Sequence, residues 1–206
     1  MKQIQTLFFF ILLSLVVFHA KAQKINGGIT AGFTASQVDG DTYSGYDKTG
    51  ITAGGFIFSE INRNMEWQLS LRYIQKGAKD DINSEINDLN YYKMHLQYFE
   101  LPFVLRYYYS DKLSFEGGLG AGYAFSGKEE DQQGELPNQE DFKPLEISMI
   151  VGINYHFNKK LFANFQFNYS MFPVRGETGH GTLWRKSGQY NNLLNFTINY
   201  RIESFR

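Results

Sequence analysis

The sequence predicts an all-β protein, namely an eight-stranded antiparallel up-and-down transmembrane β-barrel. Three observations lead to this fold class. Apolar and polar residues alternate with a period of two along most of the chain. The connections between these alternating segments are short and long in turn. The apolar side of the segments is continuous and ends in aromatic residues, whereas the polar side is mainly Gly, Ser, Thr, Asn and Gln.

The chain begins with a predicted secretory signal peptide, residues 1–22. Lys2 supplies a positive charge, residues 7–18 form the apolar run LFFFILLSLVVF, and residues 20–22 (AKA) fit the small-x-small pattern of a cleavage site. The apolar run is too short for a spanning helix, so an uncleaved anchor is the less favoured alternative. We therefore expect a mature outer-membrane β-barrel domain of residues 23–206 that begins at Gln23.

Eight alternating segments follow the signal peptide, and the pattern is weaker in the first two. The predicted strands span residues 25–35, 51–58, 65–73, 99–107, 113–126, 145–157, 161–171 and 194–202. Two irregularities stand out. Gly54 and Gly55 predict a bulge or bend in the second strand. Apolar residues occupy even positions from Tyr92 to Tyr98 and odd positions from Phe99 onward, which predicts a phase slip between Tyr98 and Phe99.

Short connections lie near residues 61–64, 110–112 and 158–160, and long ones near 36–50, 76–91, 126–142 and 173–189. This alternation is typical of an up-and-down barrel with tight turns at one rim and long loops at the other. An even number of strands returns both termini to the rim with short turns. In outer-membrane barrels that rim is periplasmic. We therefore expect a location in the cell outer membrane, with the N- and C-termini in the periplasm and four long loops outside.

Alternation alone also fits a soluble lipocalin-like barrel, in which the apolar side lines a cavity for small apolar ligands. A side that faces water is typically rich in Lys and Glu. After the signal peptide, however, the lysines lie at strand ends and in loops. The aromatic residues at the ends of the apolar side suit the two membrane interfaces. The pattern thus favours the transmembrane barrel and predicts outer-membrane lipid as its surroundings.

The polar side of the predicted strands carries a few charges of both signs. Each charge in a narrow lumen needs a partner. Arg106 lies across from Glu116 if the turn centres on Asp111, and Arg72 and Glu100 share another hairpin. We predict a structural polar network, with an ion path or ligand pocket as the alternative. Its candidate residues are Arg72, Glu100, Arg106, Glu116, Glu146, His156 and Arg201, with Glu66 on the same side.

Four stretches carry a family resemblance: GGITAGFTASQVDG (27–40), SLRYIQKGAK (70–79), YFELPFVLRYYY (98–109) and FEGGLGAGYAFSG (115–127). With them the mature chain resembles the PorT-like outer-membrane β-barrel family of Bacteroidota over essentially its whole length. The shared motifs are glycine-spaced strands and hairpin ends, so the resemblance implies a fold rather than an activity. Some members of that family are associated with protein secretion to the cell surface, a role that belongs to those particular members.

The composition excludes several kinds of chemistry. The chain has no cysteine, which excludes thiol nucleophiles and cysteine-ligated metal, and its net charge of −1 provides no basic field for nucleic acid. No serine lies in a nucleophile motif, and no zinc-ligand spacing occurs. We therefore predict no catalytic residue, no cofactor and no metal. The alternative, a barrel enzyme acting on lipid, requires a carboxylate and a hydroxyl near His95, His156 or His180.

The long loops carry most of the charge outside the strands. Three predicted outer loops are acidic and the last one is basic, which favours solvated surfaces and also allows charge pairing across the mouth. Through these loops the protein could contact other envelope proteins. We therefore expect a small non-enzymatic outer-membrane protein that is structural, adhesive, or accessory to envelope transport or secretion.

Overall fold

The computed structural model describes residues 24–40, 45–80, 91–136, 142–176 and 188–202. The predicted signal peptide and His180 lie outside these residues. No helix in the described part is long and apolar enough to cross a membrane. The strands in this part are β1 (Asn26–Asp39), β2 (Lys48–Asn62), β3 (Met65–Lys76), β4 (Lys79–Asp80), β5 (Tyr92–Tyr108), β6 (Leu113–Asp131), β7 (Gly134–Glu135), β8 (Leu145–His156), β9 (Leu161–Ser170) and β10 (Tyr190–Ile202).

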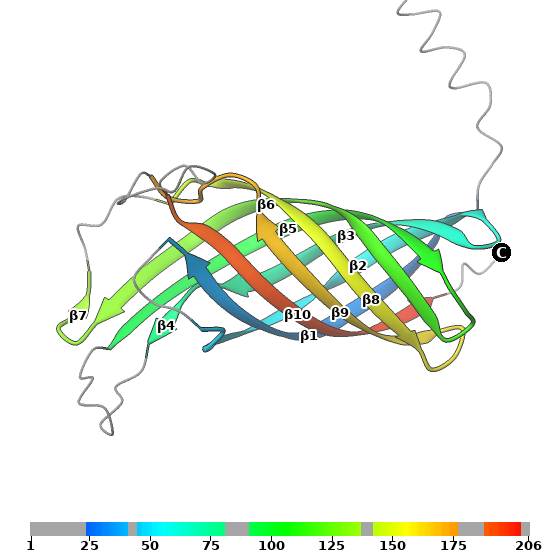
Figure 1. The fold of residues 1–206 in the computed structure, drawn as a ribbon, viewed down its shortest axis with the longest axis horizontal. Helices are drawn as coiled ribbons and strands as arrows, with labels where there is room; N and C mark the ends of the chain where they lie inside the picture. Colours follow the sequence, from blue (N-terminus) through cyan, green and yellow to red (C-terminus); the bar gives the residue numbers. More distant parts are fainter. Residues whose placement is uncertain (1–23, 41–44, 81–90, 137–141, 177–187, 203–206) are drawn as a thin grey trace, which may run out of the picture.

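Eight of these strands form a closed antiparallel barrel, which confirms the predicted fold class (Figure 1). Each long strand pairs with its neighbours in the chain, and β1 pairs with β10 to close the ring. β4 and β7 have only two residues each and extend β5 and β6 at one end. Closure leaves no long strand edge unpaired, so every spanning strand satisfies its backbone groups on both sides.

The two ends of the barrel differ. The turn end holds the short connections 63–64, 109–112 and 157–160, together with the first residues of β1 and the last of β10, where Gly27 pairs with Ile202. The loop end holds the longer connections and the short strands β4 and β7 (Figure 1). Both described termini therefore lie at the same end of the barrel.

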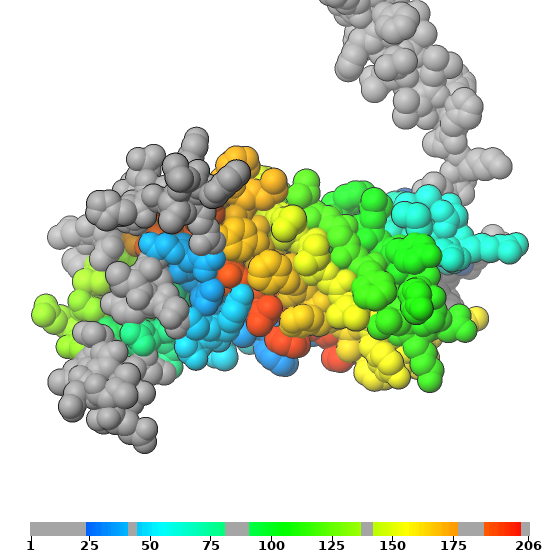
Figure 2. All heavy atoms as spheres, viewed as in Figure 1, coloured from blue at the N-terminus to red at the C-terminus, as the bar shows by residue number. Residues whose placement is uncertain are grey.

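Side chains alternate between an apolar outside and a largely polar inside. Large apolar side chains such as Phe33, Leu71 and Leu119 are about half exposed on the outside, whereas Arg106 and Glu100 inside are almost inaccessible. The space-filling view shows a continuous outer surface on the face in view (Figure 2). The lipocalin-like alternative is therefore wrong, because it requires the apolar side to face inward. An apolar exterior of this extent suits lipid.

No bulge occurs at Gly54 and Gly55, so that part of the prediction is wrong. Pairing between β1 and β2 runs without a shift past both glycines, and the β2–β3 register shifts only near the turn end, between Glu60 and Asn62. Gly54 instead allows a close approach of two strands. A Cβ atom at this position would lie 2.2 Å from the carbonyl oxygen of Leu71 in β3.

The predicted phase slip in β5 is also wrong. Even-numbered residues face the interior along the whole strand, from Tyr92 to Arg106. The residues that face the interior change from polar to apolar along the strand, while the alternation itself continues without a slip. Towards the turn end the inward residues include Glu100 and Arg106, and towards the loop end they are apolar. A register shift does occur nearby, but it lies in the pairing with β6, at Gln97 and Tyr98.

Two apolar clusters lie inside the barrel, one near each end. The loop-end core contains Val38, Ile74, Ala78, Tyr92, Met94, Leu96, Tyr98 and Leu193. The turn-end aromatic cluster contains Phe56, Phe58 and Phe162. Burying an aliphatic or phenyl side chain stabilises a fold by about 1.5–3 kcal/mol. The polar interior contacts the turn-end aromatic cluster, where Arg106 and Arg201 lie over the rings of Phe162 and Phe58.

Candidate functional site

The turn-end layer of the polar interior joins Glu66 of β3, Arg106 of β5, Glu116 of β6 and Arg201 of β10. Arg106 donates to Glu66 at 2.5 Å and to Glu116 at 2.7 Å. Arg201 donates to Glu66 at 2.7 Å, and Tyr108 donates to the other oxygen of Glu66 at 2.8 Å. The register places Arg106 directly opposite Glu116 and Glu66. Two cations thus neutralise two carboxylates in this layer.

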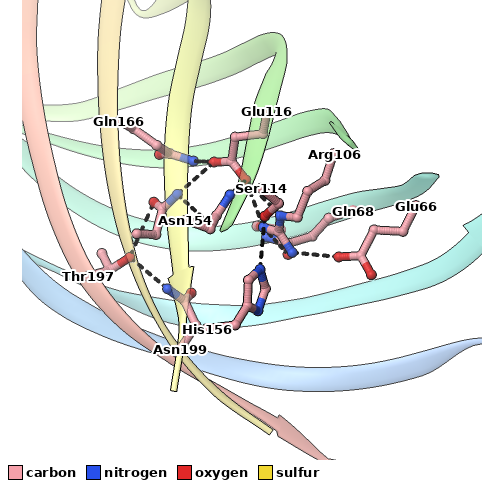
Figure 3. Close-up of polar contacts among 12 residues, drawn as sticks. Glu66, Gln68, Arg106, Ser114, Glu116, Asn154, His156, Gln166, Thr197 and Asn199 are labelled. Atoms are coloured by element: carbon pink, nitrogen blue, oxygen red, sulfur yellow. Dashed lines mark hydrogen bonds and ion pairs between the residues drawn. The ribbon is translucent and has the colours of Figure 1, made fainter. Parts of the chain in front are cut away.

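Amide side chains complete the coordination of Glu116. Its Oε1 accepts from Gln166 at 2.5 Å and from Asn164 at 2.9 Å, and its Oε2 accepts from Asn154 at 3.0 Å. Figure 3 shows Gln166 and Asn154 beside the carboxylate of Glu116. A buried carboxylate with several donors keeps its charge at low cost, because each hydrogen bond to an ion contributes about 1.5–3 kcal/mol.

The middle layer joins Arg72 and Lys76 of β3, Glu100 of β5 and Glu146 of β8. Arg72 lies 2.6 Å from Glu100, and the Lys76 ammonium lies 2.9 Å from Glu100 and 3.0 Å from Glu146. Asn191 donates to the free oxygen of Glu146 at 2.8 Å. This layer also holds two cations and two carboxylates, so its formal charge is zero.

Gln166 connects the two layers. Its Oε1 accepts from Arg72 at 2.8 Å, while its Nε2 donates to Glu116. The cavity lined by Arg72, Gln166 and Arg106 has room for about one water molecule. Charged and amide side chains therefore fill the cross-section of the barrel at this height.

A further buried ion pair lies at the loop end. Arg175 donates through both terminal nitrogens to the two oxygens of Glu129, each at 2.7 Å. Tyr92 also hydrogen-bonds to Glu129, and the guanidinium of Arg175 lies 4.2 Å from the centre of the Phe142 ring. The sequence places both charges in long loops, yet both are buried. This bidentate pair joins the end of β6 to the connection between β9 and β10 at the mouth of the barrel.

The structure brings most of the proposed network residues together. Arg106, Glu116 and Arg201 lie in the turn-end layer. Arg72, Glu100 and Glu146 lie in the middle layer. His156 stands apart, since the hydrogen bond that it makes goes to Ser114 and not to a charged group of either layer.

Sequence reasoning missed Lys76, which links Glu100 to Glu146. The sequence prediction places Lys76 in the long connection after residue 73, whereas it is the last residue of β3. One signal was available. Lys76 has the same parity as Arg72 and Ile74, so an extension of the alternation by three residues places it inside the barrel.

His156 is the residue that bears on the enzyme alternative. Its Nε2 lies 2.8 Å from the Ser114 hydroxyl, and its ring packs against Tyr108 and Phe162. Ser114 is completely buried. Among the described residues no carboxylate hydrogen-bonds to His156 or to His95, so neither has the triad that nucleophilic catalysis requires. His180 lies outside these residues. The described residues also contain no cluster of three or more His, Asp or Glu suited to a metal ion.

The closed polar-filled barrel with its apolar exterior defines a class of protein, the transmembrane β-barrel of outer-membrane type. Residues 21–175 match the family model of the outer membrane protein β-barrel domain. The chain belongs to this family. A search of curated proteins gives no match.

Solved structures share the fold. Ail, the attachment invasion locus protein of Yersinia pestis, aligns with a TM-score of 0.54 and 13% identity over 87% of this chain and 99% of its own. Neisserial surface protein A aligns with a TM-score of 0.52 and 10% identity over 85% of this chain and 97% of its own. At such identities the likeness concerns the fold alone.

Proposed function

We propose that this outer-membrane barrel is a non-enzymatic scaffold with a closed lumen, whose working surface is its loop end. One observation carries the proposal: two neutral ion-pair layers cross the described polar interior, and the cavity between Arg72, Gln166 and Arg106 has room for about one water molecule. An ion that crosses the lumen would have to break buried pairs, each of which costs several kcal/mol to open. The alternatives of an ion path and a ligand pocket are therefore disfavoured.

Conductance in planar bilayers tests this proposal. The wild-type barrel should show no conductance above the lipid background. Arg106→Ala combined with Glu116→Ala removes a cation and a carboxylate together, which keeps the layer neutral while it empties space. We expect small conductance steps from this double variant. Steady conductance of the wild type would overturn the closed scaffold.

The ends of the chain carry a second proposal. We propose that residues 1–22 are removed as a signal peptide and that the turn end lies in the periplasm, with the loop end outside. Both described termini lie at the turn end, as secretion through the periplasm requires. The chain has no cysteine, so single cysteines can be labelled without background. Lys128→Cys should react with an impermeant maleimide on whole cells, and Lys112→Cys only after lysis; the reverse pattern contradicts this orientation.

We also propose a surface role that is structural, adhesive, or accessory to envelope transport or secretion, since a closed lumen leaves the loop end as the surface that can contact other molecules. In this proposal the loop end contacts another envelope protein. Photo-crosslinking from a residue on the exposed β6–β7 hairpin tests it, with the same crosslinker at Lys112 of the turn end as control. A loop-end adduct absent from the control supports a partner. Identical adducts at both positions contradict a role for the loop end.

A further inference from the structure

The turn end of the barrel carries an excess of exposed positive charge. The start of β1 and each of the three turns at this end bear an exposed basic residue: Lys24, Arg63, Lys112 and Lys159. We call these four residues the turn-end cation rim. None of them takes part in an ion pair within the described part of the chain. Their charges are therefore directed to the surroundings of the barrel.

Acidic groups at the turn end offset only part of this charge. Among the described residues the exposed acids there are Glu60 and Asp111, so the rim and these two acids sum to a charge of +2. Lys160 is not counted, because it takes part in a further interaction. The side chains of residues 203–206 add one acid and one base, which leaves the sum unchanged. The whole chain carries −1, so positive charge is concentrated at this end.

The rim runs around the barrel instead of gathering on one side. In each turn a backbone carbonyl accepts a hydrogen bond of 2.8 Å from the strand that follows the hairpin, in the pairs Asn64 with Tyr108, Lys112 with His156, and Lys160 with Arg201. Barrel closure thus extends into the turns, which lie together at one end (Figure 1). A protein docked on one side would meet one or two of the four cations. Lipid surrounds a barrel on all sides and can reach every one of them.

Exposed aromatic residues beside the rim indicate its depth in the membrane. Tyr109 is 72% exposed and precedes Lys112 by three residues, and Phe157 is 55% exposed and precedes Lys159 by two. Aromatic residues at the edge of an apolar exterior lie at the level of the lipid headgroups. Long basic side chains place their charge at the same level while their stems stay against apolar surface. The rim is therefore within reach of headgroup phosphates.

We propose that the turn-end cation rim binds the headgroups of anionic phospholipids in the leaflet around the turn end. An anionic headgroup such as phosphatidylglycerol carries about one negative charge, so about two of them balance the excess at this end. Each basic residue near an anionic surface favours such a lipid about fivefold, the equivalent of about 1 kcal/mol. The proposal depends neither on the closed lumen nor on which side of the membrane the turn end faces.

Trp67 provides a reporter at the right place, because it lies on the outer face of β3, four residues after Arg63. The chain has two tryptophans, so Trp184→Phe leaves Trp67 alone. This reporter protein, mature and folded in phosphatidylcholine vesicles, is compared with equal mole fractions of brominated phosphatidylglycerol or brominated phosphatidylcholine, which quench tryptophan on contact. Phosphatidylglycerol should quench Trp67 as if it were enriched about fivefold. The enrichment should fall towards one in 1 M NaCl, where the screening length is about 3 Å.

Two variants of the reporter protein locate the effect. Arg63→Gln should remove most of the enrichment at Trp67, whereas Lys143→Gln, an exposed lysine at the loop end, is the matched control and should leave it unchanged. The gel band of unboiled samples checks that each variant is folded. Equal quenching by the two lipids, an enrichment that salt does not reduce, or an equal loss in Lys143→Gln would overturn the proposal. Inorganic phosphate that abolishes the enrichment where chloride of equal ionic strength does not would overturn lipid as the ligand.

Discussion

Lys76 provides the sharpest test of the charged interior. Its ammonium is 1% exposed and lies about equally far from Glu100 and Glu146, at 2.9 and 3.0 Å. Lys76→Met removes the charge and keeps most of the volume. Glu100 retains Arg72, but Glu146 is left with neutral donors. Breaking a buried pair by removal of one partner costs about 3–5 kcal/mol, so the free energy of unfolding should fall by about that amount.

A second variant checks that the loss comes from the orphaned charge. With Lys76→Met the middle layer has one cation and two carboxylates, a formal charge of −1. Adding Glu146→Gln returns it to zero, with Arg72 and Glu100 still paired. The double variant should regain roughly half of the lost stability, leaving the cost of ordinary hydrogen bonds at about 1–2 kcal/mol. It should therefore be more stable than the single variant although it carries more changes.

The assay is urea unfolding of the refolded barrel in detergent, followed by the gel mobility of unboiled samples and by tryptophan fluorescence. Coincident transitions by both probes justify a two-state free energy. Lys112→Met, on the exposed turn after β5, should change stability by less than about 0.5 kcal/mol. A loss below about 1 kcal/mol for Lys76→Met, or a double variant less stable than the single one, would refute the reasoning.

Three further predictions concern other parts of the barrel. In urea unfolding, Arg106→Met should lower the free energy of unfolding by about 3–5 kcal/mol and Arg201→Met by about 1–2 kcal/mol. The reason is that Arg106 binds two carboxylates at 1% exposure, whereas Arg201 binds one at 13%. Equal losses would contradict the assignment of Arg106 as the main cation of the turn-end layer. Gly32→Ala should abolish the heat-modifiable band, since its Cβ would lie 1.9 Å from a backbone oxygen of β10, whereas Gly55→Ala, with 3.6 Å of space, should keep it. Arg175→Gln should speed protease cleavage at the loop end, while the gel band of the folded barrel is unchanged. An unchanged cleavage rate would show that the ion pair between Arg175 and Glu129 does not hold the loop end in place.

The strands could be predicted from the sequence because alternation depends on local geometry alone. A period of two places Arg106 and Glu116 on one face whatever surrounds the barrel, and a turn at Asp111 brings them opposite each other. The pair of Arg175 and Glu129 could not be found this way. It joins the end of β6 to the connection after β9, and its geometry depends on how that connection crosses the loop end.

The inward aromatic residues show a different limit of pattern reading. Phe56, Phe58 and Phe162 have the parity of polar residues, so a simple rule of apolar outside and polar inside misplaces them. Their position has a physical reason. The guanidinium of Arg201 lies 4.4 Å from the Phe58 ring, and that of Arg106 lies 4.8 Å from the Phe162 ring. Flat rings thus cover the cations on the side that the carboxylates leave open.

The expected slip at Tyr98 and Phe99 has its explanation in a change of surroundings along β5. Outward residues are apolar from Phe99 towards the turn end and polar from Gln97 towards the loop end. Inward residues change in the opposite sense, from Glu100 to Tyr98. Where lipid surrounds the barrel, the apolar residues face outward. Where water surrounds it, the same strand has to bury its apolar residues inside, as any soluble sheet does.

This inversion assigns different stabilising forces to the two parts of the interior. The loop-end core lies beyond the apolar exterior, so its burial of apolar surface stabilises the fold in water without help from lipid. The ion-pair layers lie within the apolar exterior, where an unpaired charge is expensive on both sides of the wall. Neutrality within each layer is therefore required where lipid is outside.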